Sequence, residues 1–430
     1  MSEKLIYLLQ RLLHKTWVRC ALFSLAALVA VTLAKLLGPL IPEDIAFKLG
    51  SDSIGSLLNI IATSMLTVAV FSASTMVSSF SAVASTATPR ASQLLIEDST
   101  IQNTLATFVG AFLYSVIALV GLNAQIYGGG GRLVLFGFTL LILLMVVIVL
   151  LRWLDYLSVL GRMGETISRV EAATTKAMAQ RLKKSFMGGQ KQAENARGDH
   201  PLHAPATGFV QHVSMDILQK CAQRADATIH LHVQPGDFVE PSMVIATSTR
   251  PLDKESSKAA SDAVLIGKAR TFDHDPRFGV LVMGEIAARA LSPAVNDPGT
   301  AIVVLATAVR VMIYWVDEQR AHEKCLQDNP DPNASQPEFD RVSAPNLREA
   351  GMLTDVFEPL ARHGALAVDV GVALQHALAS LRRLNHTAFN PTIDQISRDA
   401  IERAVHAGLF APDLECLREA ALAERQARPG

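Results

Sequence analysis

Cysteine is scarce in this chain of 430 residues, which contains four. Cys20, Cys221, Cys325 and Cys416 lie far apart and form no CxxC pair. This spacing excludes a zinc-ribbon pattern and gives no sign of a disulfide framework. The pattern fits a reducing, cytosolic setting for the soluble part of the protein, and we predict no metal and no cofactor.

An excess of charge of either sign is also absent. The chain has 39 Lys and Arg residues against 40 Asp and Glu residues, and its net charge is -1. No cluster of basic residues is interleaved with aromatic ones. Because nucleic-acid binding requires a basic surface, we expect no nucleic-acid partner.

Charged side chains are missing altogether from long stretches of the first 157 residues. Apolar runs of 18 or more residues without charge are typical of membrane-spanning helices. Four predominantly apolar spans are predicted, at approximately Val18–Ile41, Ser56–Ala84, Leu105–Leu122 and Leu133–Trp153. The first contains Lys35, which lies about one turn before Gly38-Pro39, so that its ammonium can reach the membrane interface. The first is not a cleavable signal peptide, because no small-residue cleavage pattern follows it and further spans do.

Lysine and arginine set the predicted orientation of these spans. Four basic residues lie before or at the start of the first span, and seven lie at the end of the fourth span or after it. The loop between the first two spans has only Lys48 against three acidic residues. Basic flanks remain on the cytoplasmic side. We therefore predict a multi-pass membrane protein with both termini in the cytoplasm and the lipid bilayer as a partner.

The second span has an unusual composition. Between Ile54 and Pro89 it has no charge, yet more than a third of its residues are Ser or Thr. At 100° per residue, seven hydroxyl side chains fall within a sector of about 60°. These candidate pore-lining residues, called the hydroxyl face below, are Ser56, Thr63, Thr67, Ser74, Ser78, Ser81 and Ser85. The opposite sector is apolar and is predicted to face lipid; it contains Leu58, Ala62, Met65, Leu66, Ala69, Ala73, Met76, Phe80 and Val83.

The rest of the chain has the composition of soluble protein. We predict a four-span transmembrane domain at 1–157, a helical stalk and polar linker at 158–206, an α+β cytoplasmic domain at 207–325, a loop at 326–346 and a helical region at 347–430. The stalk is expected to continue the fourth span as one helix to about Phe186. The fold class is thus an α-helical membrane domain plus an α+β cytoplasmic domain with a small β-hybrid module and C-terminal helices.

The β-hybrid module is predicted from residues 207–250. A strand begins at Gly208, a helix covers Met215–Arg224, and further strands cover Thr228–Val233 and Phe238–Ala246 around a Pro235-Gly236-Asp237 turn. The layout resembles lipoyl and biotinyl domains, although no modifiable lysine is recognisable at a hairpin tip.

Histidines and carboxylates in this half allow two interpretations. His230 and His232 share a strand face, with His212 nearby, but lack a third ligand at diagnostic spacing, so an exposed strand face is favoured over a metal site. The Asp273-His274-Asp275 cluster could supply acid–base chemistry. A capped loop whose carboxylates accept backbone or Arg hydrogen bonds is favoured, and no enzyme activity is predicted.

A second loop has a mechanical explanation. Asp297 suits a helix N-cap with Pro298 in the first helical position. The following helix, Thr300–Trp315, is predicted to bury Val303, Leu305, Val309 and Met312.

Taken together, these motifs resemble a bacterial family of predicted membrane proteins, domain of unknown function 2254, over most of the chain. The motif residues are Pro89, Arg90, Pro235, Gly236, Asp237, Asp275, Phe278, Gly279, Ser292, Pro293, Asn296, Asp297 and Pro298, with Phe108, Gly110, Phe112 and Tyr114 in the third span. The resemblance implies an inner-membrane protein with a cytoplasmic domain. It implies no particular activity, cofactor or catalytic residue.

Three functions fit these patterns. The preferred hypothesis is an oligomeric channel or transport pathway for ions or small solutes, lined by the hydroxyl face and gated by the cytoplasmic domain. The alternative is a membrane-tethered scaffold or sensor, in which the hydroxyls bond across packed helices. A membrane enzyme is third, because only Asp273-His274-Asp275 offers an acid/base group. A homo-oligomer is expected, and the soluble partner is unknown.

Overall fold

The computed structural model describes residues 16–37, 51–96, 98–193, 196–328 and 337–426. It contains two compact units. The membrane unit consists of Ile6–Ser85 and Pro89–Glu165, and the α+β unit consists mainly of Thr166–Gly430.

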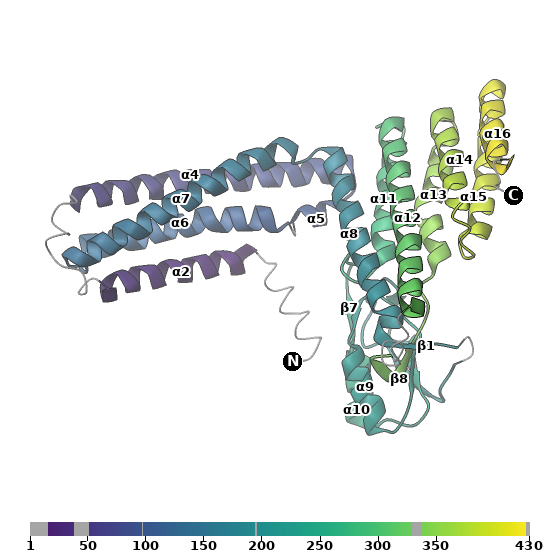
Figure 1. The fold of residues 1–430 in the computed structure, drawn as a ribbon, viewed down its shortest axis with the longest axis horizontal. Helices are drawn as coiled ribbons and strands as arrows, with labels where there is room; N and C mark the ends of the chain where they lie inside the picture. The colour runs from purple at the N-terminus through teal and green to yellow at the C-terminus, as the bar shows by residue number, and fades with distance from the viewer. Residues whose placement is uncertain (1–15, 38–50, 97, 194–195, 329–336, 427–430) are drawn as a thin grey trace. The chain divides into compact units, whose positions relative to one another are not determined.

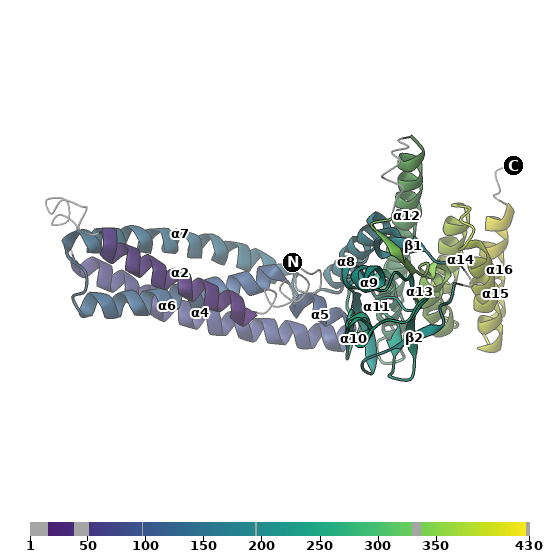
Figure 2. The same ribbon diagram turned by 90° about the horizontal axis from the view of Figure 1, so that it is seen from below.

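The membrane unit is built from four long helices that lie side by side in both views (Figures 1 and 2). They are α2 (Thr16–Leu37), α4 (Ser51–Thr86), α6 (Ser99–Asn123) and α7 (Gly129–Val159), with the short α5 (Ala91–Ile96) before α6. Towards one end of the unit Leu58, Tyr114 and Leu135 form the core. Met65, Phe108 and Trp153 belong to a second cluster further along. The interior is therefore filled with side chains along its length.

Four helices of the described residues are long and apolar enough to cross a membrane: Ile54–Thr86, Ser99–Asn123, Gly129–Val159 and Pro298–Cys325. The first three coincide with the predicted second, third and fourth spans. The predicted first span extends beyond the described residues after Leu37, and its described part forms α2.

The fourth of these helices is a core element of the α+β unit. It belongs to α12 (Pro298–Asp328), which packs against α11 (Pro276–Ala290) and α14 (Val368–Arg382). Arg310, near its middle, donates to both carboxylate oxygens of Glu171 at 2.8 and 2.7 Å. A helix that pairs a charged side chain with a neighbour in this unit is better explained by packing than by a bilayer.

The α+β unit contains two sheets. The five-stranded sheet has the order β1 (Gly189–Lys191), β8 (Phe339–Ala344), β4 (Ile229–Leu231), β6 (Val244–Ser248) and β2 (His200–His203). β8 is parallel to both its neighbours, and the other pairings are antiparallel. The three-stranded antiparallel sheet has the order β5 (Phe238–Val239), β3 (Gly208–Val213) and β7 (Val264–Gly267).

Helices complete this unit. α8 (Met163–Lys183) leads through a single turn, η2 (Ser185–Gly188), into β1. α9 (Met215–Arg224) and α10 (Lys254–Asp262) join the core that the sheets share. The C-terminal region forms α13 (Glu349–His363), α14, α15 (Asn390–His406) and α16 (Ala411–Gln426), as predicted for residues after 347 (Figure 1).

Some sequence predictions of local structure are wrong. The loop predicted at 326–346 contains β8, and the predicted linker Gln190–Pro205 contains the end of β1 and all of β2. Both segments are polar and short, and they become strands because distant strands supply their hydrogen-bond partners. The expected strand Phe238–Ala246 is divided into β5 and β6, so the strands of the predicted β-hybrid module lie in different sheets.

Helix continuity and burial also differ in two places. The fourth span and the stalk are separate helices, because the chain turns at Gly161, whose φ of +84° favours glycine. In α12, Leu305 and Met312 are buried as predicted and Val309 is half-buried, but Val303 is exposed. Val303 falls on the opposite side of the helix from Leu305, since residues two apart are about 200° apart.

Candidate functional site

The hydroxyl face of α4 lies on the outside of the membrane unit. All seven of its residues are exposed: Ser56, Thr63, Thr67, Ser74, Ser78, Ser81 and Ser85. The hydroxyl face therefore forms no part of the core that the helices of one chain share.

The predicted lipid face of α4 is instead its packed face. Leu58, Met65 and Val83 are buried, and the first two belong to the clusters built with α6 and α7. The expectation that this sector faces lipid is thus wrong for most of its residues, although Leu66 is exposed. Periodicity separates the two sides of a helix, but it does not say which side meets the neighbouring helices.

Large apolar side chains border the hydroxyl face. Ile60 and Phe71 lie along one edge and Val70 and Val77 along the other, and each is about 60 % exposed. An exposed stripe of hydroxyls between two apolar borders is suited to contact with other membrane helices.

Several hydroxyls of this face already donate within their own helix. Thr63 Oγ1 donates to the Asn59 carbonyl oxygen at 2.9 Å, and Thr67 Oγ1 to that of Thr63 at 3.1 Å. Ser85 Oγ donates to the Ala82 carbonyl oxygen at 2.8 Å. Since a hydroxyl has one donor and two acceptor lone pairs, these groups present acceptors outward.

A polar hollow of about 470 Å³ lies where α4 begins, α6 ends and α7 begins. Ser56 of the hydroxyl face contributes to it, together with Asn59, Asn123 and Arg132. Asn59 is not among the residues predicted from the sequence, because its helical angle lies about 70° from the centre of the hydroxyl sector.

The motif residues of the α+β unit converge on a buried ion pair. Asp275 caps α11 by accepting the Phe278 amide at 3.2 Å, and Arg270 Nε donates to its other oxygen at 2.7 Å. Gly236 has a φ of +96° and packs directly against this carboxylate. The favoured interpretation of the Asp273-His274-Asp275 cluster, a capped loop, is confirmed for Asp275.

Neighbouring motif residues fix the same region. In the Pro235-Gly236-Asp237 turn, Gly236 N donates to the Val210 carbonyl oxygen at 2.8 Å, which ties the turn to β3. Asp237 accepts from Arg348 Nη2 at 2.9 Å. Gly279 lies against the side chain of Thr174 in α8, and Phe278 packs against Phe272 with ring centroids 4.6 Å apart and ring planes inclined at 50°. These residues therefore hold the fold of the α+β unit.

The remaining motif residues lie at turns. Asp297 caps α12 as predicted, accepting from the Thr300 amide at 3.0 Å and its hydroxyl at 2.6 Å, and these bonds hold the pKa of the Asp297 carboxyl below its ordinary value. Ser292, Pro293, Asn296 and Pro298 form the partly exposed turn before α12. Pro89 and Arg90 are exposed, and the Pro89 carbonyl oxygen accepts from Ser92 Oγ at 2.8 Å.

The three histidines are divided between the two sheets. His230 Nδ1 lies 2.7 Å from Ser343 Oγ, and His232 Nε2 lies 3.0 Å from Thr247 Oγ1. Both are half-buried rather than exposed, and burial lowers the pKa of each. His212 lies in β3, beside His274. Within the described ranges no group of three or more His, Cys, Asp or Glu could hold a metal ion.

Comparison with known proteins adds the family. A model of the family described as "Predicted membrane protein (DUF2254)" matches residues 14–380. An uncharacterized protein of Mycobacterium bovis and one of Mycobacterium tuberculosis are each 36% identical over 111 residues, which is 24% of this chain and 21% of theirs. The chain thus aligns with about a fifth of the length of these relatives. No solved structure matches.

The predicted resemblance to this family is confirmed, since its model covers well over half of the chain and spans both the membrane unit and the motifs of the α+β unit. The chain belongs to the DUF2254 family of predicted membrane proteins.

Proposed function

We propose that the protein forms a homo-oligomer in which the hydroxyl faces of several α4 helices line a path for ions or small solutes across the bacterial inner membrane. The observation that supports this is the exposure of all seven hydroxyl residues on the outside of the membrane unit. In a single copy they would face hydrocarbon, where there is no water to form hydrogen bonds with their hydroxyl groups.

The packing of the membrane unit favours a path between copies over a path within one. Leu58, Phe108, Tyr114 and Leu135 are fully buried and fill the space between the helices. A solute could not pass through such a core, because protein interiors are packed as densely as organic crystals. The exposed face of α4 is the surface at which a shared axis would lie.

The chemistry of the hydroxyl face suits small solutes or weakly selected cations. Among its seven residues there is no charged side chain, and strong ion selectivity is usually fixed by charged or carbonyl rings. The outward lone pairs of Thr63 and Thr67 could replace part of the hydration shell of a cation. The hollow lined by Ser56, Asn59 and Arg132 would form a wetted mouth.

Topology assigns the rest of the chain. The basic residues that flank the spans support a cytoplasmic location for both termini and for the α+β unit. There the α+β unit would act as the gate or vestibule of the path, and it would be the part available to a soluble partner.

The second candidate is a membrane-tethered scaffold or sensor with no transport. It is favoured by the hydroxyls of Thr63, Thr67 and Ser85, which donate within their own helix and so lower the cost of facing lipid or another helix. In that case the hydroxyl face would be a dry contact between copies.

Flux through liposomes separates the two. The full chain reconstituted in liposomes should pass small ions, and Thr67→Leu, Ser74→Leu and Ser78→Leu should each lower the flux several-fold with unchanged melting temperature. Thr32→Leu is the matched control, because Thr32 is an exposed hydroxyl on α2 that donates to its own helix. Absence of flux from folded, assembled protein would overturn the path.

Water access to the hydroxyl face gives a second test. In a variant without the four native cysteines, Ser74→Cys should react with a membrane-impermeant thiol reagent if the face lines a path. A dry contact in a scaffold would protect the same position. Assembly in mild detergent completes the comparison, since a ring of three or more copies supports the path and a monomer contradicts it.

A further inference from the structure

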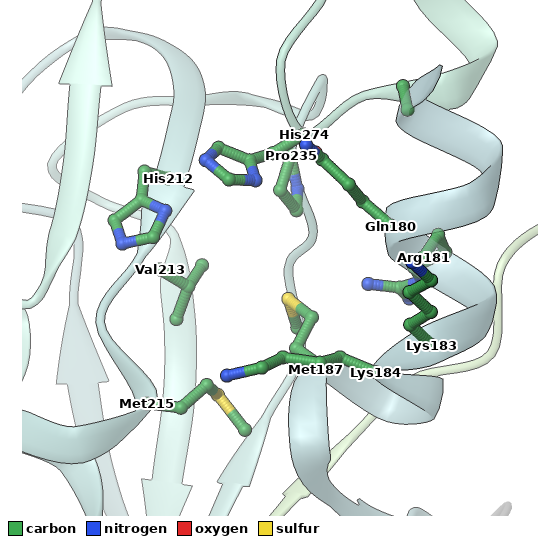
Figure 3. Close-up of a pocket in the computed structure, with 11 residues that line it drawn as sticks. Gln180, Arg181, Lys183, Lys184, Met187, His212, Val213, Met215, Pro235 and His274 are labelled. Carbon is green, nitrogen blue, oxygen red and sulfur yellow. The ribbon is translucent and has the colours of Figure 1, made fainter. Parts of the chain in front are cut away.

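The α+β unit contains a cavity of about 350 Å³ between the end of α8 and strand β3 (Figure 3). Its lining residues all lie between Ala177 and His274, within this unit. The cavity is separate from the hydroxyl face, so the inference drawn from it does not rest on a membrane path.

One side of the cavity is apolar. Val213 at the end of β3 and Met215 at the start of α9 form this wall, and Met187 of η2 faces it. Phe186 and Met187 have φ values of 52° and 58°, which bulky residues rarely adopt. This backbone conformation turns the chain sharply after α8 and brings the Met187 side chain to the cavity.

The other side of the cavity carries the guanidinium of Arg181, which has few hydrogen-bond acceptors near it. Among the residues that the structure describes, the hydrogen bond of Arg181 is from Nη2 to the Pro345 carbonyl oxygen at 3.3 Å, and no carboxylate oxygen lies within 4 Å. A guanidinium has five N–H donors. Burial lowers the pKa of Arg181 to about 10, although Asp275 acts against this shift. A half-buried cation with no carboxylate in direct contact lacks much of the compensation for its lost hydration.

Helix geometry explains only part of this arrangement. Arg181 and Lys183 stand in the last turn of α8, where the helix dipole favours cations. That effect is available to an exposed side chain as well, and it does not require a half-buried guanidinium beside an apolar cavity.

A second cation reaches the same space. Figure 3 shows the Lys184 side chain extending across the cavity towards Met215. Its ammonium also lies 3.1 Å from the exposed Glu338 carboxylate, which leaves it near the cavity edge. Two positive side chains thus face an apolar wall from one side.

Two imidazoles also line the cavity, along with the side chains of Gln180 and Lys183. The rings of His212 and His274 lie side by side, 4.8 Å between centroids. Burial lowers the pKa of both, to about 4 for His212, so both are neutral near pH 7. Neutral imidazoles can hydrogen-bond to a bound head group without adding further positive charge.

We propose that this cavity is a binding site for a small amphiphilic anion. Arg181 and Lys184 bind its carboxylate or phosphate head, and its short hydrocarbon body packs against Met187, Val213 and Met215. The volume is at the low end of the range of about 300–1,000 Å³ for small-molecule pockets, which limits the body to a short or medium chain.

Equilibrium dialysis tests the site with the full chain in lipid nanodiscs. The probes are radiolabelled octanoate and octyl phosphate. Octanol is the control that has the hydrocarbon chain without the charge, and inorganic phosphate is the control that has the charge without the chain. Saturable binding of octanoate or octyl phosphate is expected, and whichever binds more tightly identifies the head group. Octanol and inorganic phosphate should each bind at least tenfold more weakly.

Variants locate the site and remove the contribution of the lipid. Arg181→Met should weaken binding of the anion about tenfold or more, as expected for loss of a charge-assisted hydrogen bond, and should leave the melting temperature unchanged or higher. Lys184→Met should weaken it less. Lys258→Met removes an exposed lysine on α10 that does not line the cavity, and it should bind like the wild type. Because the probe partitions equally into the nanodiscs of all variants, a difference between variants reports binding to the protein.

Three results would overturn the proposal: equal binding of octanol and octanoate, wild-type binding by Arg181→Met, or inorganic phosphate binding as tightly as octyl phosphate. If Arg181→Met does not fold, Ala177→Leu provides the second variant. Ala177 lines the cavity from α8, and a larger side chain there should reduce binding by occupying the space for the hydrocarbon body. Unreduced binding in that variant would also contradict the site.

Discussion

Gly236 packs directly against the carboxylate of Asp275, so that a methyl group at position 236 would overlap with Asp275 Oδ2. The Pro235-Gly236-Asp237 turn and the Asp275 cap are 39 residues apart in the sequence, and they meet at the ion pair with Arg270. This contact explains why a glycine stands in the turn.

We therefore expect Gly236→Ala to lower the stability of the α+β unit by about 2–4 kcal/mol, from backbone strain plus overlap with a buried carboxylate. Thermal unfolding of the purified chain measures the loss. Gly408→Ala is the matched control, because Gly408 also has a positive φ but has open space around it, and it should cost only about 1 kcal/mol. Equal melting temperatures for the two variants would contradict the contact.

Removing one partner of the ion pair between Arg277 and Asp355 should destabilise the α+β unit more than replacing both partners with apolar residues. Arg277 Nε and Nη2 donate to the two carboxylate oxygens of Asp355 at 2.9 and 3.1 Å, and both side chains are largely buried. Asp355→Leu alone should cost roughly 3–5 kcal/mol, because the guanidinium loses its partner. Adding Arg277→Met should recover much of this loss. A double variant less stable than either single one would contradict this.

The packed face of α4 can be tested by paired truncations. Leu58→Ala should destabilise the membrane unit by about 2–5 kcal/mol, since Leu58 is fully buried in the core with Tyr114 and Leu135. Val70→Ala should have little effect, because Val70 is 63% exposed. Unfolding in detergent, followed by circular dichroism, measures both. The opposite ranking would mean that the helix is rotated from its position in the structure.

Acid should weaken the α+β unit through His212. Burial, repulsion from His274 and the weaker opposing effect of Asp216 give His212 a pKa of about 4, against an ordinary value of 6.5. Below pH 6.5 the unfolded chain binds a proton that the folded chain excludes, so stability falls as the pH drops from 6.5 to 4, by up to about 3 kcal/mol. Unfolding midpoints across this pH range measure the effect. His212→Gln should flatten the dependence, and an unchanged slope in that variant would assign it to other groups.

The sequence by itself determined the features that depend on local composition and periodicity. Charge-free runs predicted the second, third and fourth spans, the cap at Asp297 predicted the start of α12, and the amphipathic pattern after residue 347 predicted the C-terminal helices. The two-sided character of α4 was also visible in sequence, because a 3.6-residue period assigns each side chain an angle on the helix.

Only the tertiary structure decided what meets each surface. It overturned the expected lipid contact of the apolar side of α4, because packing against α6 and α7 buries Leu58 and Met65. The same packing leaves Ser74 and Ser78 on the outside of the membrane unit. It made β8 a strand that pairs with β1 and β4, both more than 100 residues before it in the sequence. No local propensity encodes such a pairing. It also brought Arg181 beside Met215 and His212 at one cavity. Long-range packing determines burial, and burial gives these otherwise ordinary residues their chemistry.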